Sequence, residues 1–113
     1  MEIDEISKIV STTLSYLSEA QKLSAINIAN ANVPGKNAMS VSFEDFINEI
    51  DGGKELTHHD VTEIMHSLVN DNKKIDLGAE VAQSHELALK YDTMVELFNK
   101  QLALYRMAIT GRG

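Results

Sequence analysis

Two histidines and a glutamate are the side chains of this sequence whose types and spacing could best do chemistry. His59, Glu63 and His66 are spaced i, i+4 and i+7, so a helix would carry them on one face. Two imidazoles and a carboxylate are ligands that zinc accepts. This spacing is not a known metalloprotease motif, however, and three such residues on a surface helix often arise by chance. We therefore expect no metal site.

Other kinds of catalytic site lack their sequence context. Serine, histidine and aspartate are present, but not in the strand–turn–helix setting that a nucleophile uses. No glycine-rich phosphate loop occurs, because Gly52 and Gly53 follow a short helical segment and are typical of a helix end. The absence of cysteine excludes disulfides, thiolate metal ligands and cysteine catalysis. The sequence therefore predicts neither an enzyme nor a cofactor-binding protein.

Composition narrows the class of protein further. The 113 residues are enough for one small domain, and ten lysines and arginines stand among seventeen acidic residues, for a net charge of −7. Such scattered basic residues make nucleic-acid binding and a polybasic membrane anchor poor candidates. No apolar run approaches the roughly 18 residues of a membrane span. The acidic start, MEIDEISKIV, lacks the basic residues and apolar block of a secretory signal, so we expect no cleaved signal peptide.

The first segment that could position side chains is helical and runs from about Ile3 to Ala31. Its seam residues alternate spacings of three and four, as in a helix that packs lengthwise on another helix. These residues are Ile3, Ile6, Val10, Thr13, Leu17, Ala20, Ser24 and Asn27. Pro34 and Gly35 then predict a turn, because the residue before a proline avoids helical geometry.

The last segment has the same repeat and is longer. Asp76 is a suitable N-cap, and the predicted helix from Leu77 to Thr110 has a length of about 50 Å at 1.5 Å per residue. Its seam residues are Val81, Ser84, Ala88, Tyr91, Val95, Phe98, Leu102, Tyr105 and Ile109. We expect Tyr91 and Tyr105 to pack along this seam.

The middle of the chain predicts short elements. A brief extended piece is expected around Met39, followed by a helix that Ser42 caps and another that Thr57 caps with Asp60 three residues on. The apolar faces of these helices are Phe43, Phe46, Ile47 and Ile50 in the first, and Val61, Ile64, Met65 and Leu68 in the second. The stretch NDNKK, Asn70–Lys74, is expected to be a polar loop.

These elements predict an all-α fold, in which long N-terminal and C-terminal helices pack as an antiparallel coiled-coil pair. Residues 1–35 form the first helix and its Asn-Pro-Gly motif, 36–75 a small irregular, short-helical middle, and 76–113 the second helix; the two helices make one core domain. Because the second helix is the longer, part of its apolar stripe should lack a partner within the chain. Exposed stripes of this kind mark protein–protein surfaces, so we expect a subunit of a larger assembly.

Both ends of the chain resemble the flagellar basal-body rod proteins. The run NIANANVPG, Asn27–Gly35, is similar to the ANNIANxxTPGY signature of flagellar axial proteins. At the other end, KIDLGAEVA (74–82) resembles VDLDxEMA, Leu89–Tyr91 resembles LxY, and Leu104–Gly111 resembles LRxAIxG. The nearest resemblance is to the proximal rod proteins of the FlgB type. Lys36 stands where that family has an aromatic residue, and Val33 where it has threonine.

The resemblance implies a structural subunit of the proximal rod of the bacterial flagellum that polymerises through its terminal helices. Its partners would be other rod subunits, the rod-base and export-gate proteins, and further copies of itself. It would reach the periplasmic rod through the flagellar type III export apparatus, without a cleaved signal peptide. The alternative is a small helical adaptor or chaperone of the flagellar export system, which would hold a client in a groove between its helices.

The resemblance and the two seams together predict an assembly interface. Its residues are Ile6, Val10, Leu17, Asn27, Asn30, Pro34, Gly35, Tyr91, Val95, Phe98, Leu102, Tyr105 and Ile109. Asn27 and Asn30 lie three apart on one face, so their amides could fix register across a subunit boundary, as a polar residue in a coiled-coil seam does. The alternative for these asparagines is that they only cap the helix before the proline.

Overall fold

The computed structural model describes residues 3–50 and 56–111, which are mostly helical. In chain order the elements are α1 (Ile3–Ala29), β1 (Asn37–Ser40), α2 (Phe43–Glu49), α3 (His58–Leu68), β2 (Asn70–Lys74) and α4 (Leu77–Thr110). The prediction of a long helix at each end and short helices between them is confirmed. The predicted helix stop at Gly52 and Gly53 lies outside the described residues.

The prediction of an all-α fold is confirmed only in part: the described residues are mostly helical, but β1 and β2 form a small antiparallel sheet. Asn37 lies opposite Lys74, and the register shifts beyond Ala38, so that Ser40 lies opposite Asn70. The sequence predicted an extended piece for β1 but a loop for β2. Every side chain of β2 is exposed, and a strand without a buried face has no apolar alternation from which it could be recognised.

Local capping fixes where the helices begin and end. Ser42, Thr57 and Asp76 cap α2, α3 and α4 as predicted, each accepting a backbone N–H of the first turn. At α3 the exchange is reciprocal, because the Asp60 carboxylate accepts the Thr57 N–H at 3.0 Å. Gly111 ends α4 in the left-handed region, with φ of 74°, where glycine is favoured.

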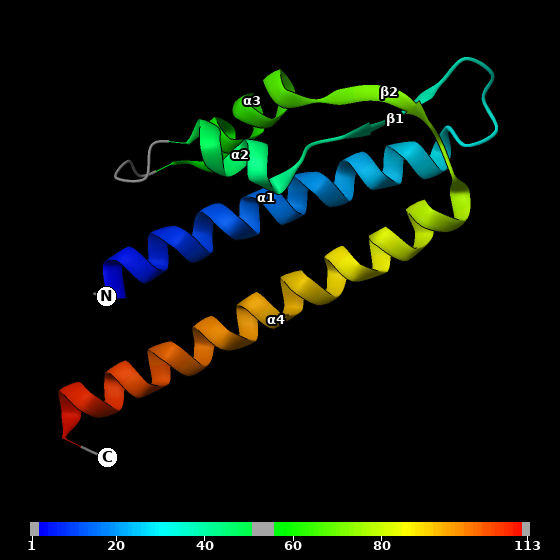
Figure 1. Ribbon diagram of the computed structural model, residues 1–113. Coiled ribbons are helices and arrows are strands. Elements are labelled where there is room, and N and C mark those ends of the chain that lie inside the picture. The colour runs from blue at the N-terminus through cyan, green and yellow to red at the C-terminus, as the bar shows by residue number, and fades with distance from the viewer. Residues whose placement is uncertain (1–2, 51–55, 112–113) are drawn as a thin grey trace.

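α1 lies between two layers (Figure 1). The sheet with α2 and α3 covers one side of α1, and α4 lies along the other. Both chain termini lie at one end of the molecule, and the loop after α1 and the start of α4 lie at the opposite end. The molecule is therefore elongated, with principal extents of 61 × 27 × 19 Å.

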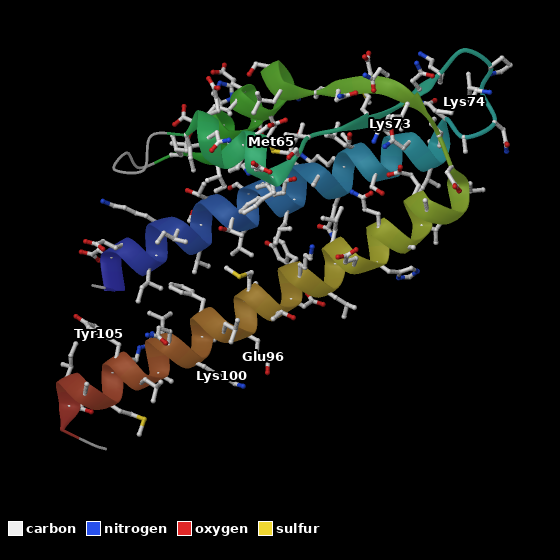
Figure 2. The ribbon with its side chains drawn as sticks, viewed as in Figure 1. Met65, Lys73, Lys74, Glu96, Lys100 and Tyr105 are labelled. Atoms are coloured by element: carbon white, nitrogen blue, oxygen red, sulfur yellow. The ribbon has the colours of Figure 1, made fainter. Side chains whose placement is uncertain are left out.

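The tightest part of the core lies between α1 and the middle segment. The buried cluster comprises Tyr16, Leu17, Leu23, Val41, Phe46, Val61, Met65 and Leu87. Phe46, Val61 and Met65 are the largest fully buried side chains, and all three come from α2 and α3; Figure 2 shows Met65 facing α1. α4 supplies only Leu87 to the buried set, with Tyr91 and Met94 partly buried beside it. The middle segment therefore supplies more buried side chains to the core than α4 does.

Tyr16 joins α1 to α2 and to the residue that follows β1. Its ring meets Phe43 edge-on at a centroid distance of 5.0 Å and lies 5.1 Å from the ring of Phe46. Its hydroxyl donates a hydrogen bond to the Val41 carbonyl oxygen at 2.6 Å. Burial raises the pKa of the Tyr16 hydroxyl above its ordinary value, because the phenolate would be poorly solvated there.

Truncating Phe46 should test this description of the core. Phe46→Ala removes a fully buried ring and should lower the free energy of unfolding by about 3–5 kcal/mol. Its neighbour Ile47 is 44 % exposed, so Ile47→Ala should cost about 1 kcal/mol or less. Urea unfolding followed by circular dichroism measures both variants. Equal losses in the two would contradict the placement of the core on this face of α2.

Tyr16→Phe should make stability less sensitive to alkali. The folded pKa of Tyr16 is raised above 10.0, so the hydroxyl stays protonated where the unfolded chain ionises. The wild type should therefore keep this contribution below pH about 10 and lose it as pH rises through the folded pKa. The variant should lose about 1 kcal/mol at neutral pH, through the missing hydrogen bond, and fall less above pH about 10. Urea unfolding at neutral pH and above pH about 10 measures the stability of both proteins. An equal loss of stability above pH about 10 in the wild type and the variant would contradict this prediction.

Candidate assembly surface

α4 is longer than the helix that it lies against. It has 34 residues and α1 has 27, a difference of about 10 Å at 1.5 Å per residue. The end of the molecule that holds the loop after α1 and the start of α4 is called the loop end. There the two helices are held together, since the Ser24 hydroxyl donates to the Glu80 carbonyl oxygen at 3.3 Å. The excess length of α4 therefore projects at the other end, beside both termini (Figure 1).

The projecting part of α4, Leu102–Thr110, is called the α4 overhang below. Leu104 and Ile109 in it are 61 % and 66 % exposed, and Tyr105, labelled in Figure 2, and Met107 are exposed as well. At 100° per residue, Leu104 and Met107 lie on one side of the helix, and Tyr105 and Ile109 lie on the other. Its only charged residue is Arg106. Apart from Arg106 and Thr110 the segment is apolar, and a largely apolar helix is typical of a buried position, so this segment has the composition of an interface.

A second exposed apolar strip runs along the outer face of α4. Leu89 and Leu97 are exposed there, and Leu104 continues the line seven residues after Leu97. A surface ion pair flanks each of these leucines: Lys90 with Glu86 at 3.1 Å, and Lys100 with Glu96 at 3.6 Å (Figure 2 labels the second pair). Sequence analysis missed this strip because it followed a single seam, although the seven-residue spacing of two leucines was a signal.

The surface of the chain is larger than that of a compact monomer. Its solvent-accessible area is 7765 Å², whereas a compact protein of 12.5 kDa has about 6,200 Å². The radius of gyration is 16.9 Å, against about 13 Å for a compact domain of this length. The excess exceeds the roughly 800 Å² that each partner commonly loses in a stable interface. The exposed helix surface is therefore large enough for association.

The predicted interface residues differ in how far the chain itself buries them. Val10 and Leu17 on α1 are buried within the chain. The half-buried members are Ile6, Asn30, Tyr91, Val95, Phe98 and Leu102. Tyr105 and Ile109 are exposed in the α4 overhang, and Pro34 and Gly35 are exposed at the opposite end. Residues at the two ends of the predicted interface are therefore exposed, whereas those in its centre are buried or half-buried by the chain itself.

The Asn27 side chain, for which an intersubunit role was predicted, makes hydrogen bonds within the chain. Asn27 is 2 % exposed, and its side-chain amide pairs with the backbone of Met39 in β1. The Asn27 Nδ2 donates to the Met39 carbonyl oxygen at 2.9 Å, and the Met39 N–H donates to the Asn27 Oδ1 at 2.8 Å. This amide imitates the hydrogen bonds of a neighbouring strand, so it holds β1 against the end of α1. Asn30, three residues on, continues the last turn through its backbone N–H, which donates to the Ile26 carbonyl oxygen at 3.0 Å.

The Val-Pro-Gly sequence forms a tight exposed turn beyond α1. The Lys36 N–H donates to the Val33 carbonyl oxygen at 3.3 Å, which closes a four-residue turn. Pro34 occupies its second position, and Gly35 occupies its third with φ of 80°, the arrangement of a type II turn. A residue with a side chain is strained at such a φ, so glycine is required there. The turn presents Val33 to solvent at the loop end of the molecule.

The His59, Glu63 and His66 triad is not assembled as a metal site. The His59 Nε2 lies 3.0 Å from the Glu63 Oε1 in an exposed pair. The His66 Nε2 instead faces α1 and lies 3.6 Å from the buried carboxylate of Glu19, which Lys22 also approaches at 3.6 Å. Within residues 3–50 and 56–111, no group of three or more histidine, aspartate or glutamate side chains is placed to hold a metal ion.

Comparisons with known proteins give no family. No family model matches the chain, and no curated protein or solved structure is significantly similar to it. In the part of the chain that the structure describes, no helix is both long enough and apolar enough to cross a bilayer.

Removing the Asn27 amide should destabilise the fold. Asn27→Ala deletes two hydrogen bonds and leaves the backbone N–H and carbonyl of Met39 without these partners, which should cost about 2–4 kcal/mol in unfolding free energy. The matched control is Asn30→Ala, which leaves the backbone bonds of the helix end in place and should cost about 0.5 kcal/mol. Urea unfolding of both variants measures the difference. If Asn27→Ala unfolds as the wild type does while only its association is impaired, the intrachain role is refuted.

Proposed function

We propose that this chain is a structural subunit of the proximal rod of the bacterial flagellar basal body. The observation that carries the proposal is the α4 overhang, an exposed helix end that carries large apolar side chains on two sides. Such a segment is poorly suited to water and well suited to enclosure by neighbouring subunits. The resemblance of Asn27–Gly35 and Leu104–Gly111 to rod-protein motifs supports the choice of this assembly over other helical polymers.

In this proposal α1 and α4 act as an antiparallel coiled-coil pair and form the core domain of the subunit. The hydrogen bond from Ser24 to Glu80 at one end, and the burial of Leu17 and Leu87 nearer the middle, support this pairing. The middle segment then covers the outer side of α1. The seam of the pair continues past α1 into the overhang, where a neighbouring subunit would supply the missing partner.

The Asn-Pro-Gly motif has a physical role in the same proposal. Asn27 fastens β1 to α1, and the type II turn at Pro34 and Gly35 reverses the chain between them. Together they give the loop end a fixed shape, which a subunit needs when that end meets another molecule. The asparagine thus contributes to assembly indirectly, by ordering the surface rather than by crossing it.

The proposed surroundings follow from the proposed assembly. The partners are other rod subunits, rod-base and export-gate proteins, and copies of the same chain. The location is the periplasmic rod, which the chain reaches through the flagellar type III export apparatus without a cleaved signal peptide. An export adaptor or chaperone is the alternative, and it differs in one measurable respect: it remains a discrete monomer or dimer at any concentration.

Polar substitution of the overhang should abolish self-association without unfolding the chain. Leu104→Gln with Ile109→Gln removes two apolar side chains that are 61 % and 66 % exposed. Sedimentation velocity should show the wild type forming larger species as its concentration rises, and the double variant remaining monomeric at the same concentrations. The two substitutions should weaken the free energy of association by about 2–4 kcal/mol, because the apolar surface of these side chains is no longer buried.

The matched control is Ile47→Gln, which places the same polar side chain at an exposed isoleucine of α2. It should associate as the wild type does, and circular dichroism should show equal helix content in all three proteins. A wild type that stays monomeric at high concentration, alone and with partner rod proteins, would contradict the proposed function and favour the adaptor. Strong hydrogen-exchange protection of the α4 overhang in a dilute monomer would do the same.

A further inference from the structure

Exposed apolar side chains gather at both ends of the long axis, not only at the overhang. At the opposite end, Ile26 on α1, Val33 in the turn, and Leu77 and Val81 on the first turns of α4 are all exposed. This is the loop end, and we call the α4 overhang with the first turn of α1 the overhang end. The two ends are separated by most of the 61 Å length of the molecule, so one chain cannot bring its own ends together.

Lysines predominate among the exposed charges of the loop end, and carboxylates predominate among those of the overhang end. Lys36, Lys73 and Lys74 lie at the loop end, where Figure 2 labels the two that close β2; the nearby carboxylate of Asp76 accepts the Ala79 N–H as the cap of α4. At the overhang end, Asp4 and Glu5 are exposed in the first turn of α1, with Arg106 as the one charge of the overhang. Within residues 3–50 and 56–111, none of the three lysines forms an ion pair, and neither Asp4 nor Glu5 does.

We propose that the overhang end of one copy docks on the loop end of the next copy, in a head-to-tail contact along the long axis. Each end then covers the exposed apolar side chains of the other, and the lysines of the loop end approach Asp4 and Glu5. A contact between two loop ends would instead place six lysines together. This inference rests on the proposed function, which requires a polymer that can keep growing. A head-to-tail chain of copies always has one free overhang end and one free loop end, to which further copies can be added. A contact between like ends closes into a dimer and stops.

Single cysteines can report which ends meet, because the chain has none of its own. One variant carries Val33→Cys at the loop end, and the other carries Ile109→Cys in the overhang and a mass tag. The two are mixed at a concentration at which the wild type associates, and a short thiol-reactive bifunctional cross-linker is added. We expect mostly tagged–untagged pairs. Ile47→Cys, on the exposed side of α2, gives the level of cross-linking that arises from random collision.

The other products have defined meanings. Pairs of two Ile109→Cys chains, or of two Val33→Cys chains, as the main product would show contact between like ends and overturn the inference. Cross-linking at the Ile47→Cys level in samples that associate would overturn it as well and leave the proposed function standing. A wild type that does not associate under any condition would instead remove the proposed function.

Charge reversal gives a second, independent readout. Lys73→Glu with Lys74→Glu makes the loop end repel the overhang end, and Asp4→Lys with Glu5→Lys does so from the other side. Each double variant alone should associate at least about tenfold more weakly than the wild type in sedimentation. An equimolar mixture should regain association, because each variant then offers an end that complements the other. Circular dichroism confirms that both are folded; unchanged association of folded variants, or a mixture that gains nothing, would refute the head-to-tail contact.

Discussion

The buried amide of Asn27 is the contact on which the placement of the other elements depends. It fixes the backbone of Met39, and therefore β1, against the last turn of α1. β1 holds β2 through the two-stranded ladder, and β2 ends at Lys74, two residues before the Asp76 cap of α4. The start of α4 is thereby held beside the end of α1. A side chain is needed for this because β1 is a strand of only four residues, and a two-stranded ribbon alone is marginally stable.

From that fixed point, helix length determines which surfaces remain uncovered. α1 ends and α4 begins at the loop end, so the extra residues of α4 project at the far end. Residues 103–111 are all exposed there. The middle segment cannot cover them, because its buried side chains, Phe46, Val61 and Met65, are committed to the opposite side of α1. The chain therefore has a well-packed centre and an apolar helix end, an arrangement that favours association over function as a lone monomer.

The sequence predicted what is local and missed what is formed by distant residues. The α4 bounds and the caps Ser42, Thr57 and Asp76 were predicted correctly, because a cap depends on residues three positions apart. β2 was missed because its polar side chains have no buried face, and only backbone pairing with β1 identifies it. The bonds from Asn27 to Met39 were not predicted, since Met39 lies beyond a turn whose path the sequence does not specify. The same limit applies to the outer strip at Leu89 and Leu97, whose exposure depends on how α4 is rotated against α1.

The order of the α4 overhang is coupled to its environment. Its residues are held in the subunit by hydrogen bonds within the helix, and a helical segment of about ten residues is marginal in water without tertiary contacts. The Gly111 cap and the bonds from the Thr110 hydroxyl to the backbone of the preceding turn stabilise the end only locally. A neighbour that encloses Leu104 and Ile109 would therefore add burial and also stabilise the helical state of the last turns. Assembly at this end should then be cooperative, because a docked overhang is already in the shape that further neighbours require.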